Sequence, residues 1–387
     1  MKKDLDIVVY GATGFTGKLA ALYLAANAPA KLRWALAGRN VKKLAEVKAQ
    51  LVAINPALAS LPILEASAEN PASLEALAKA ARVVLTTVGP YALYGEPLVK
   101  ACATYGADYV DITGEPHFVR EMIEKYDGLA TESKSRIVHC CGFDSIPHDV
   151  GAYYTVKQLG DREPIALSGF VRSGGTTFSG GTWQSAINGL SQARKSNFSV
   201  PRRATHRQIS SGKAHLHYAR TIKAWACPLP TIDGPIVLRS ASTVDAYGPS
   251  FSYGHYAHVN HLATVVGAAV GFGAIAALAQ FAPTKRLLEK ARPSGQGPSD
   301  VQLKNGWFQV TFEGTTPSQR VVTRVKGGEP GYAETSKMIA ECALALALDR
   351  KRLPERYGVL TPVAALEDVL LERLQKAGIG FEVLSRG

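Results

Sequence analysis

Three glycines near the start of the chain, Gly11, Gly14 and Gly17, are spaced three residues apart. An apolar run at residues 7–10 precedes them, and an alanine-rich segment at residues 18–26 follows at once. This order predicts a strand, a tight turn and a helix. In such a unit the first glycine permits the turn, the second lets the backbone approach a pyrophosphate, and the third lets the helix pack against the strand. The helix N-terminus then offers free N–H groups to the phosphates.

The end of the second apolar segment, residues 32–37, indicates which dinucleotide would bind. Folds that bind NAD usually place Asp or Glu at this point, where the carboxylate holds the ribose 2′-hydroxyl. This chain has Arg39 instead, with Lys42 and Lys43 just beyond. A guanidinium can bind a 2′-phosphate through two hydrogen bonds, whereas a carboxylate would repel it. We therefore expect NADP. The alternative is that Arg39 is an ordinary solvated side chain at a helix start.

Apolar strands and helices continue to alternate as far as residue 140. Helices are expected at residues 41–53, 71–81, 95–105 and 116–133, and further strands at 61–64, 83–88, 108–112 and 136–140. Six strands with helices between them predict a doubly wound parallel sheet of the Rossmann type, an α/β fold. The loop Gly89-Pro90-Tyr91 would lie at the carboxyl edge of this sheet, where ligands bind in such folds.

The excess of basic residues narrows the class of partner. Lys and Arg number 44 against 32 for Asp and Glu, which gives a formal charge of +12 and favours anionic partners. The basic residues are scattered and no nucleic-acid-binding signature occurs, so we expect no nucleic acid. The five cysteines form no Cys-x-x-Cys pair, so neither a disulfide framework nor a metal site is expected. The N-terminus lacks an apolar signal region, and a reducing cytoplasm fits.

A set of motifs resembles the saccharopine dehydrogenase-like oxidoreductases: Gly-Ala-Thr-Gly-Phe-Thr-Gly (11–17), Ala-Gly-Arg (37–39), Val-Gly-Pro-Tyr (88–91), Tyr-Val-Asp-Ile-Thr-Gly-Glu (109–115) and Gly-Phe-Asp-Ser-Ile-Pro (142–147). Within this family the chain is most similar to the branch of the bacterial trans-acting enoyl reductases. The similarity continues in residues 172–176, 179–182, 359–362 and 381–383. The resemblance implies an NADP-dependent oxidoreductase.

The resemblance also implies a second domain inserted in the chain, after which the last helices return to the nucleotide domain. Alternating apolar segments within residues 164–258 and 307–326 are typical of an antiparallel sheet, and 333–348 reads as a helix. We predict a Rossmann domain at 1–145 and an α+β domain with a mostly antiparallel sheet at 146–328. Residues 329–387 would then pack back on the first domain.

The sequence offers more candidates for cofactor binding than for catalysis. The expected cofactor-binding residues lie at the ends of three strands: Gly11, Thr13, Gly14, Phe15, Thr16, Gly17, Arg39, Asn40, Gly89, Pro90 and Tyr91. Tyr91 and His148 could donate a proton, and Asp144 could orient a substrate group. Each also has a structural explanation, since Asp144 precedes Pro147 and fits a helix cap. No nucleophilic triad, metal-ligand cluster or Ser-Tyr-Lys pattern is found, so catalysis would rest mainly on positioning.

For two segments the sequence does not decide whether they contact protein, lipid or solvent. Residues 262–282 carry no charge, which reaches the length of a membrane span, although many of them are Ala or Gly. This segment could be a buried helix, an interfacial helix assisted by Lys285, Arg286, Lys290 and Arg292, or a true span. The basic segment 194–220 could be a solvated loop or a docking patch for an acidic acyl carrier protein or anionic lipid. A homodimer contact and peripheral membrane contact stay open.

The sequence is consistent with three functions. The first, implied by the resemblance, is an NADP-dependent enoyl reductase that reduces a C=C bond of a lipid or carrier-linked acyl substrate. The second is a saccharopine dehydrogenase-type imine or amino-acid reductase, which would want fixed cations for substrate carboxylates; Arg172, Arg220 and Arg239 are only loosely placed for this. The third is a non-catalytic lipid-surface protein that keeps the nucleotide fold. An apolar cavity in the second domain would favour the first function and a cationic pocket the second.

Overall fold

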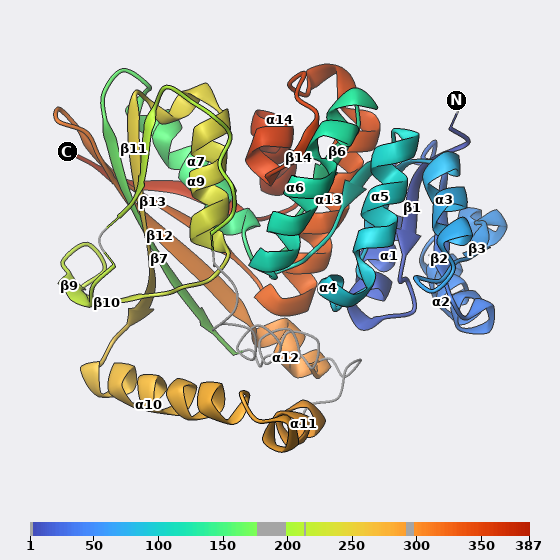
Figure 1. Cartoon of the computed structure of the whole chain (residues 1–387), viewed down its shortest axis with the longest axis horizontal. Helices are drawn as coiled ribbons and strands as arrows, with labels where there is room; N and C mark the ends of the chain where they lie inside the picture. Colours follow the sequence, from blue (N-terminus) through green and yellow to red (C-terminus); the bar gives the residue numbers. More distant parts are fainter. Residues whose placement is uncertain (1–2, 176–198, 213, 292–297) are drawn as a thin grey trace. The chain divides into compact units, whose positions relative to one another are not determined.

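The computed structural model describes residues 3–175, 199–212, 214–291 and 298–387 (Figure 1). The chain forms two compact units. The first unit contains Met1–Phe143 and Tyr332–Ala377, and the second contains Asp144–Gly331 and Gly378–Gly387. Each unit is built around its own sheet, and each is described by itself.

The first unit holds a seven-stranded sheet in which every strand pair is parallel. Its strands are β1 (Leu5–Tyr10), β2 (Trp34–Gly38), β3 (Ile63–Glu65), β4 (Ala81–Thr86), β5 (Asp108–Val110), β6 (Arg136–Val138) and β14 (Gly358–Leu360). Their spatial order is β14-β6-β5-β4-β1-β2-β3. The strand order therefore changes direction between β1 and β4, which is the point where open parallel sheets bind ligands. The predicted fold class is confirmed.

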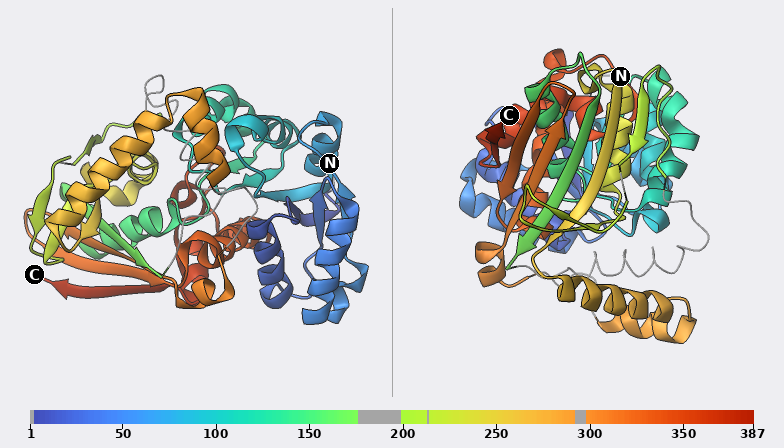
Figure 2. Two further views of the ribbon diagram at one scale, coloured as in Figure 1. Left: turned by 90° about the horizontal axis from the view of Figure 1, so that it is seen from below. Right: turned by 90° about the vertical axis from the view of Figure 1, so that its left-hand side faces the viewer.

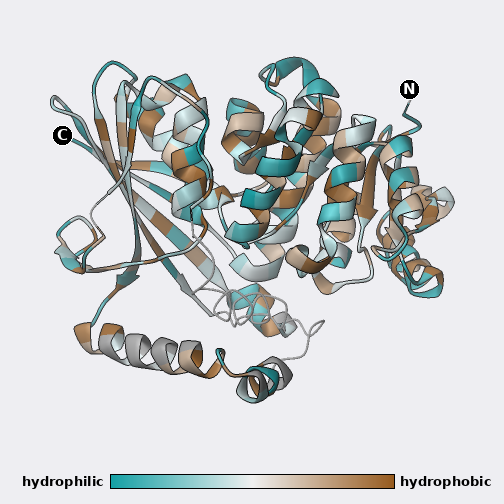
Figure 3. Ribbon diagram, viewed as in Figure 1, coloured by the Kyte–Doolittle hydropathy of each residue, from teal (hydrophilic) through white to brown (hydrophobic). Residues whose placement is uncertain are grey.

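Helices cover both faces of this sheet. They are α1 (Phe15–Asn27), α2 (Val41–Ile54), α3 (Pro71–Ala80), α4 (Tyr91–Tyr94), α5 (Glu96–Tyr105), α6 (Pro116–Glu132), α13 (Thr335–Leu348) and α14 (Pro362–Lys376). Alternate strand residues such as Val8 and Val84 form one core with Leu77, Val99 and Phe118 from α3, α5 and α6. On the other side α1 packs between α2 and α13, and α13 packs on α14. The strands are apolar and the outer helix faces are polar (Figure 3).

The second unit holds an eight-stranded mixed sheet, seen face-on in the right-hand view of Figure 2. Its strands are β7 (Ile165–Gly174), β8 (Gln208–Ser211), β9 (His217–Ala219), β10 (Ala224–Pro228), β11 (Ser250–Val259), β12 (Trp307–Thr315), β13 (Arg320–Gly327) and β15 (Gly380–Arg386). The order is β15-β13-β12-β7-β11-β10-β9, and β8 pairs with β11. Most pairs are antiparallel as predicted, whereas β11 runs parallel to both β7 and β8.

Two helices of the second unit pack on its sheet and on each other. Helix α7 (Ile146–Leu159) packs on β12 and β13, and α9 (Asp233–Thr243) packs on β11 and β8. The other α-helices among the described residues of this unit are α10 (Leu262–Leu278), α11 (Ala282–Ala291) and α12 (Asp300–Asn305). These contacts bring the first turns of α7 and α9 close to the middle of β11. No pattern in the sequence indicates that these three segments meet.

The tail of the chain departs from the predicted division. Helices α2, α3, α5 and α6 begin and end within one residue of the predicted bounds. The tail 329–387 was expected to pack entirely on the first domain, yet residues 378–387 belong to the second unit, where β15 pairs antiparallel with β13. The first sheet also has a seventh strand, β14, beside β6. Both additions are edge strands; the three residues of β14 are buried, whereas β15 is mostly exposed.

The apolar segment predicted at 262–282 forms α10 and the turn after it. Leu262, Leu278 and Phe281 are exposed, so the interpretation as a buried helix is wrong at these positions. Within the described part of the chain, no helix combines the length and the apolar character that crossing a membrane requires. The interpretation as an interfacial helix stays a prediction.

Two glycines inside helices allow a matched test of packing in each unit. A methyl group on Gly151 of α7 would overlap the Phe312 ring and lie 2.8 Å from Cγ2 of Val325, whereas on Gly128 of α6 it would meet nothing within 4 Å. Gly151→Ala should therefore destabilise the second unit by about 1–3 kcal/mol through overpacking. Gly128→Ala should stabilise the first unit by about 0.4–1 kcal/mol. Urea unfolding midpoints of both variants measure this; equal shifts for the two would contradict the packing described.

Candidate functional site

The glycine turn between β1 and α1 has the three roles that its spacing predicts. Gly11 has a φ of +90°, a conformation that residues with a side chain rarely adopt. A side chain on Gly17 would overlap the carbonyl oxygen of Gly11 and lie 2.7 Å from Oγ1 of Thr87, so this glycine lets α1 pack on the sheet. Gly14 is different, because a Cβ there would meet only the Gly11 oxygen, at 3.3 Å. Packing within the protein therefore does not require a glycine at this position. The missing side chain leaves room for a ligand instead.

Helix α1 begins at this turn without a capping side chain. Gly14 occupies the N-cap position, and no side chain among the described residues bonds to the free N–H groups of the first turn. The N-terminus of a helix carries a partial positive charge and unsatisfied donors, which together suit a phosphate. The free N–H groups at this turn can therefore bind an anion that lies at the carboxyl edge of the sheet.

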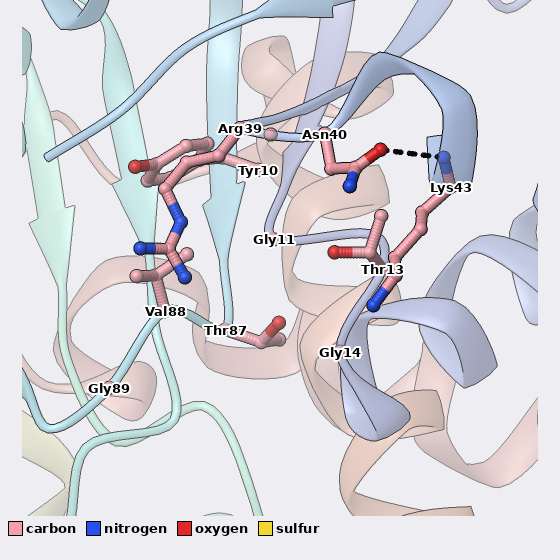
Figure 4. Close-up of a pocket in the computed structure, with 11 residues that line it drawn as sticks. Tyr10, Gly11, Thr13, Gly14, Arg39, Asn40, Lys43, Thr87, Val88 and Gly89 are labelled. Atoms are coloured by element: carbon pink, nitrogen blue, oxygen red, sulfur yellow. Dashed lines mark hydrogen bonds between the residues drawn. The ribbon is translucent and has the colours of Figure 1, made fainter. Parts of the chain in front are cut away.

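A cavity of about 530 Å³ lies over the turn at the carboxyl ends of β1, β2 and β4 (Figure 4). Its lining residues are Tyr10, Gly11, Thr13, Gly14, Gly38, Arg39, Asn40, Lys43, Thr87, Val88 and Gly89. The described residues of this lining include two cations and no carboxylate. Neither Arg39 nor Lys43 forms an ion pair with a described residue, and both side chains are exposed. The positive charges of Arg39 and Lys43 therefore favour the binding of an anion in this cavity, at the end of β2.

Two polar groups complete the fit of this cavity to a phosphorylated dinucleotide. The side chain of Asn40 accepts a hydrogen bond from the Lys43 N–H at 3.0 Å, which caps α2, and Lys43 lines the same cavity as Arg39. Oγ1 of Thr87 is buried and has no hydrogen-bond partner in the part of the chain that the structure describes. A buried polar atom of this kind normally finds a partner, and here it lines the cavity.

The structure separates the predicted cofactor residues into two groups. Six of them line the cavity: Gly11, Thr13, Gly14, Arg39, Asn40 and Gly89. The others, Phe15, Thr16, Gly17, Pro90 and Tyr91, do not. The Phe15 ring packs edge-on against Tyr332 at 4.7 Å, and the Thr16 carbonyl accepts a hydrogen bond from Ser336. These two residues hold α1 in place.

Tyr91, predicted as a proton donor, is enclosed by the first unit. Its hydroxyl donates to the Thr86 carbonyl at 3.2 Å and accepts from the Ile112 N–H at 3.3 Å. Burial, with Asp111 nearby, raises its pKa well above the ordinary value. Both oxygens of Glu115 accept hydrogen bonds from the backbone N–H groups of Tyr91 and Ala92, at 3.0 Å each. The contacts assign Tyr91 to holding the loop after β4.

A second pocket, of about 360 Å³, lies wholly within the second unit. Its apolar lining is Val200, Ala214, Pro228, Leu229, Pro230, Pro235 and Leu238, and its polar lining is Ser199, Arg202, Ser211, Tyr253 and His255, with three glycines between them. Tyr253 and His255 are two residues apart on β11 and so face the same side of the sheet. The Tyr253 hydroxyl lies 3.1 Å from Nδ1 of His255.

His148 and Asp144, the other predicted catalytic residues, have different surroundings in this unit. Asp144 is exposed, whereas His148 is buried on the first turn of α7. Nδ1 of His148 lies 3.1 Å from Oδ1 of Asp233, and Nε2 of His255 lies 3.4 Å from Oδ2. Burial works against the charge on Asp233, but the two imidazoles hold its pKa well below the ordinary value. Burial lowers the pKa of His255.

Several residues of both sites were not predicted from the sequence. Four residues line the first cavity at the carboxyl edge of the sheet: Tyr10 and Gly38 end β1 and β2, and Thr87 and Val88 follow β4. Their position at the ends of parallel strands was the available signal. Lys43 was noted only for its charge. Asp233, Tyr253 and His255 had no signal, because α9 and β11 meet α7 only in three dimensions.

A doubly wound parallel sheet with a glycine turn and an anion-binding cavity at its switch point defines a dinucleotide-binding protein. The chain matches the model of the saccharopine dehydrogenase NADP-binding domain over residues 7–138. It is 38% identical to a protein of Mycobacterium tuberculosis that is provisionally named a trans-acting enoyl reductase, over 98% of this chain and 97% of the relative. It is 34% identical, with the same coverage, to the trans-acting enoyl reductase of Mycobacterium ulcerans.

The fold has a solved counterpart as well. Apo saccharopine dehydrogenase (L-Glu forming) from Saccharomyces cerevisiae aligns over 98% of this chain and 99% of its own length, with a TM-score of 0.58 and 11% identity. The chain belongs to the saccharopine dehydrogenase-like oxidoreductases, in the branch of the trans-acting enoyl reductases. It is an NADP-dependent oxidoreductase, so the predicted family, enzyme class and cofactor are confirmed.

Proposed function

We propose that the protein reduces a carbon–carbon double bond of a lipid or carrier-linked acyl substrate. The pocket of the second unit is the observation that carries this proposal. Its described lining is largely apolar and includes one cation, Arg202. An acyl chain buries CH₂ groups against such a surface, with about 0.8 kcal/mol of stabilisation for each group. The names of the relatives support the same substrate class.

An amino-acid or imine substrate fits this pocket less well. Its carboxylates would want several fixed cations, yet Arg172, Arg220 and Arg239 are not among the described lining residues. The Arg172 guanidinium lies over the Trp307 ring, and the Arg239 side chain is buried with a hydrogen bond to the Pro201 carbonyl. Arg220 is exposed. We therefore keep the imine reductase as the second candidate and the non-catalytic lipid-surface protein as the third.

The residues of the first cavity have defined tasks when NADPH is bound. The N-terminus of α1 and Gly14 would hold the pyrophosphate, while Arg39 and Lys43 would hold the 2′-phosphate. The bound cofactor supplies the hydride. Neither Asp144 nor His148 lines the pocket of the second unit, and Tyr91 is held by its own loop. We propose that the reaction depends mainly on the positioning of the cofactor and the acyl chain.

Docking of an acyl carrier protein is a further part of the proposal. Arg194, Lys195 and Lys213 of the basic segment 194–220, and the motif at 179–182, lie outside the described residues. Two described cations serve internal contacts: Arg207 pairs with Asp245 at 2.6 Å and donates to the Ala241 carbonyl, and Arg202 donates to Ile209. Carrier docking would therefore rest on the other basic residues of the segment.

The exposed apolar ends of α10 are our candidates for peripheral lipid contact or a dimer contact.

The experiment follows NADPH oxidation with trans-2-enoyl thioesters of increasing chain length. Because each buried CH₂ stabilises by about 0.8 kcal/mol, kcat/KM should rise about fourfold per CH₂ until the pocket is filled. Gly234→Leu fills the pocket from α9, where the nearest atom to a new Cβ is Cβ of His255 at 3.7 Å. This variant should lose the long-chain preference and keep short-chain turnover and NADPH affinity. Turnover of an α-keto acid with an amino acid, and none of enoyl thioesters, would support the imine reductase instead.

A further inference from the structure

Three side chains from three elements meet in the second unit. His148 comes from the first turn of α7, Asp233 from the start of α9 and His255 from the middle of β11. Their side chains are 2%, 4% and 5% exposed, respectively. One potential ligand atom of each lies within 4.8 Å of those of the other two. His255 pairs across the sheet with Gly169, whose lack of a side chain leaves room for the Tyr253 hydroxyl.

Each imidazole of this cluster faces its own oxygen of the Asp233 carboxylate. Nδ1 of His148 lies 3.1 Å from Oδ1, and Nε2 of His255 lies 3.4 Å from Oδ2. Donor atoms bound at about 2.0–2.1 Å to a tetrahedral metal are roughly 3.3 Å apart, so each imidazole lies at the spacing of a co-ligand of the carboxylate. Asp233 Oδ1 and His255 Nε2 are both buried, so water does not separate the carboxylate from the two imidazoles.

Neighbouring groups hold two of these side chains in orientation. The Tyr253 hydroxyl lies 3.1 Å from Nδ1 of His255, which leaves Nε2 directed at Asp233. The Thr231 hydroxyl donates to Oδ2 of Asp233. Metal-binding imidazoles and carboxylates are commonly fixed by such outer contacts. His255 also lines the 360 Å³ pocket, so a fourth position beside it would be reached from the pocket.

We propose that His148, Asp233 and His255 bind a divalent transition metal of the zinc class, with the fourth position facing the pocket. Two imidazoles and a carboxylate form a donor set that zinc accepts, and a site with three protein ligands keeps a position for water or a ligand. The sequence analysis expected no metal, since these residues are far apart in the chain and lack the spacing of a metal motif. The proposal is independent of the acyl substrate.

The test uses the metal alone. Full-length protein without an affinity tag is treated with a chelator, exchanged into metal-free buffer and titrated with Co²⁺, whose visible absorption reports tetrahedral coordination. We expect saturation at a single Co²⁺ per chain, displacement by Zn²⁺, and a rise in Tm with Zn²⁺. His255→Ala and Asp233→Asn should each weaken binding at least tenfold. Tyr253→Phe should weaken it about tenfold to a hundredfold by removing an outer contact.

A surface histidine pair provides the matched control. The rings of His215 and His217 are 5.1 Å apart in the same unit, so His217→Ala should leave the affinity unchanged. Near-ultraviolet circular dichroism checks that each variant is folded, and Asp233→Asn keeps the volume of the side chain. Absence of stoichiometric binding by the folded wild type would overturn the proposal. So would binding that His255→Ala and Asp233→Asn leave intact. The cluster would then be a hydrogen-bonded pair of imidazoles around a carboxylate.

Discussion

Gly14→Val should abolish NADPH binding and leave the first unit folded. The φ of −72° at Gly14 is open to any residue, and a Cβ there would meet only the Gly11 oxygen, at 3.3 Å. The added methyl groups would stand where the pyrophosphate approaches the N-terminus of α1. Two lost hydrogen bonds to a charged group cost about 3 kcal/mol or more, so the Kd should rise at least about a hundredfold.

NADPH fluorescence and circular dichroism on the same sample measure this change. Gly128→Val is the matched control, because that position has nothing within 4 Å and lies away from the cavity on α6. Gly17→Ala makes an informative contrast, since its methyl group would press on Gly11 and Thr87 and should lower stability as well as binding. If Gly14→Val binds NADPH as the wild type does, the phosphates do not lie on this turn.

Arg39→Ala should weaken NADPH at least about tenfold and leave NADH nearly unchanged. Arg39 lines the cavity without a carboxylate partner among the described residues, so its guanidinium is available to a 2′-phosphate. A hydrogen bond to a charged group contributes about 1.5–3 kcal/mol, which corresponds to a factor of ten or more. Binding titrations with both cofactors give the ratio directly.

Two neighbouring lysines separate a specific contact from the general charge. Lys43 lines the cavity and Lys42 does not, although both are exposed on the first turn of α2. Lys43→Ala should therefore reduce NADPH affinity, and Lys42→Ala should leave it unchanged. Equal losses for NADPH and NADH in Arg39→Ala would refute the assignment of the 2′-phosphate to this end of β2.

The sequence predicted what a continuous stretch of chain determines. The glycine turn, α1 and Arg39 lie within one βαβ unit, so their spacing carries both the fold and the anion site. Strand β14 escaped prediction because it joins the first sheet far along the chain from β6, outside the continuous alternation of strands and helices that reveals its neighbours. Strand β15 escaped prediction because it is an edge strand that is mostly exposed, so its hydrophobic periodicity is weak.

The candidate catalytic residues show the limit of reasoning from residue type. Tyr91 follows a strand at the carboxyl edge, where a proton donor is expected, but its hydroxyl is occupied by Thr86 and Ile112. His148 was recognised, while its companions Asp233 and His255 were not. They meet only because α7 and α9 pack on the same face of the second sheet, and no local pattern encodes that contact.

The path of the chain has a consequence for its synthesis. It passes between the two units three times, after Phe143, Gly331 and Ala377. Each sheet receives a strand, β14 or β15, that follows all its other strands in the chain. During translation, domains generally fold as they emerge, N-terminal part first. Here the sheet edges on β6 and on β13 stay open until residues 358–386 have been synthesised, so shielding of those edges in the nascent chain should govern the yield of native protein.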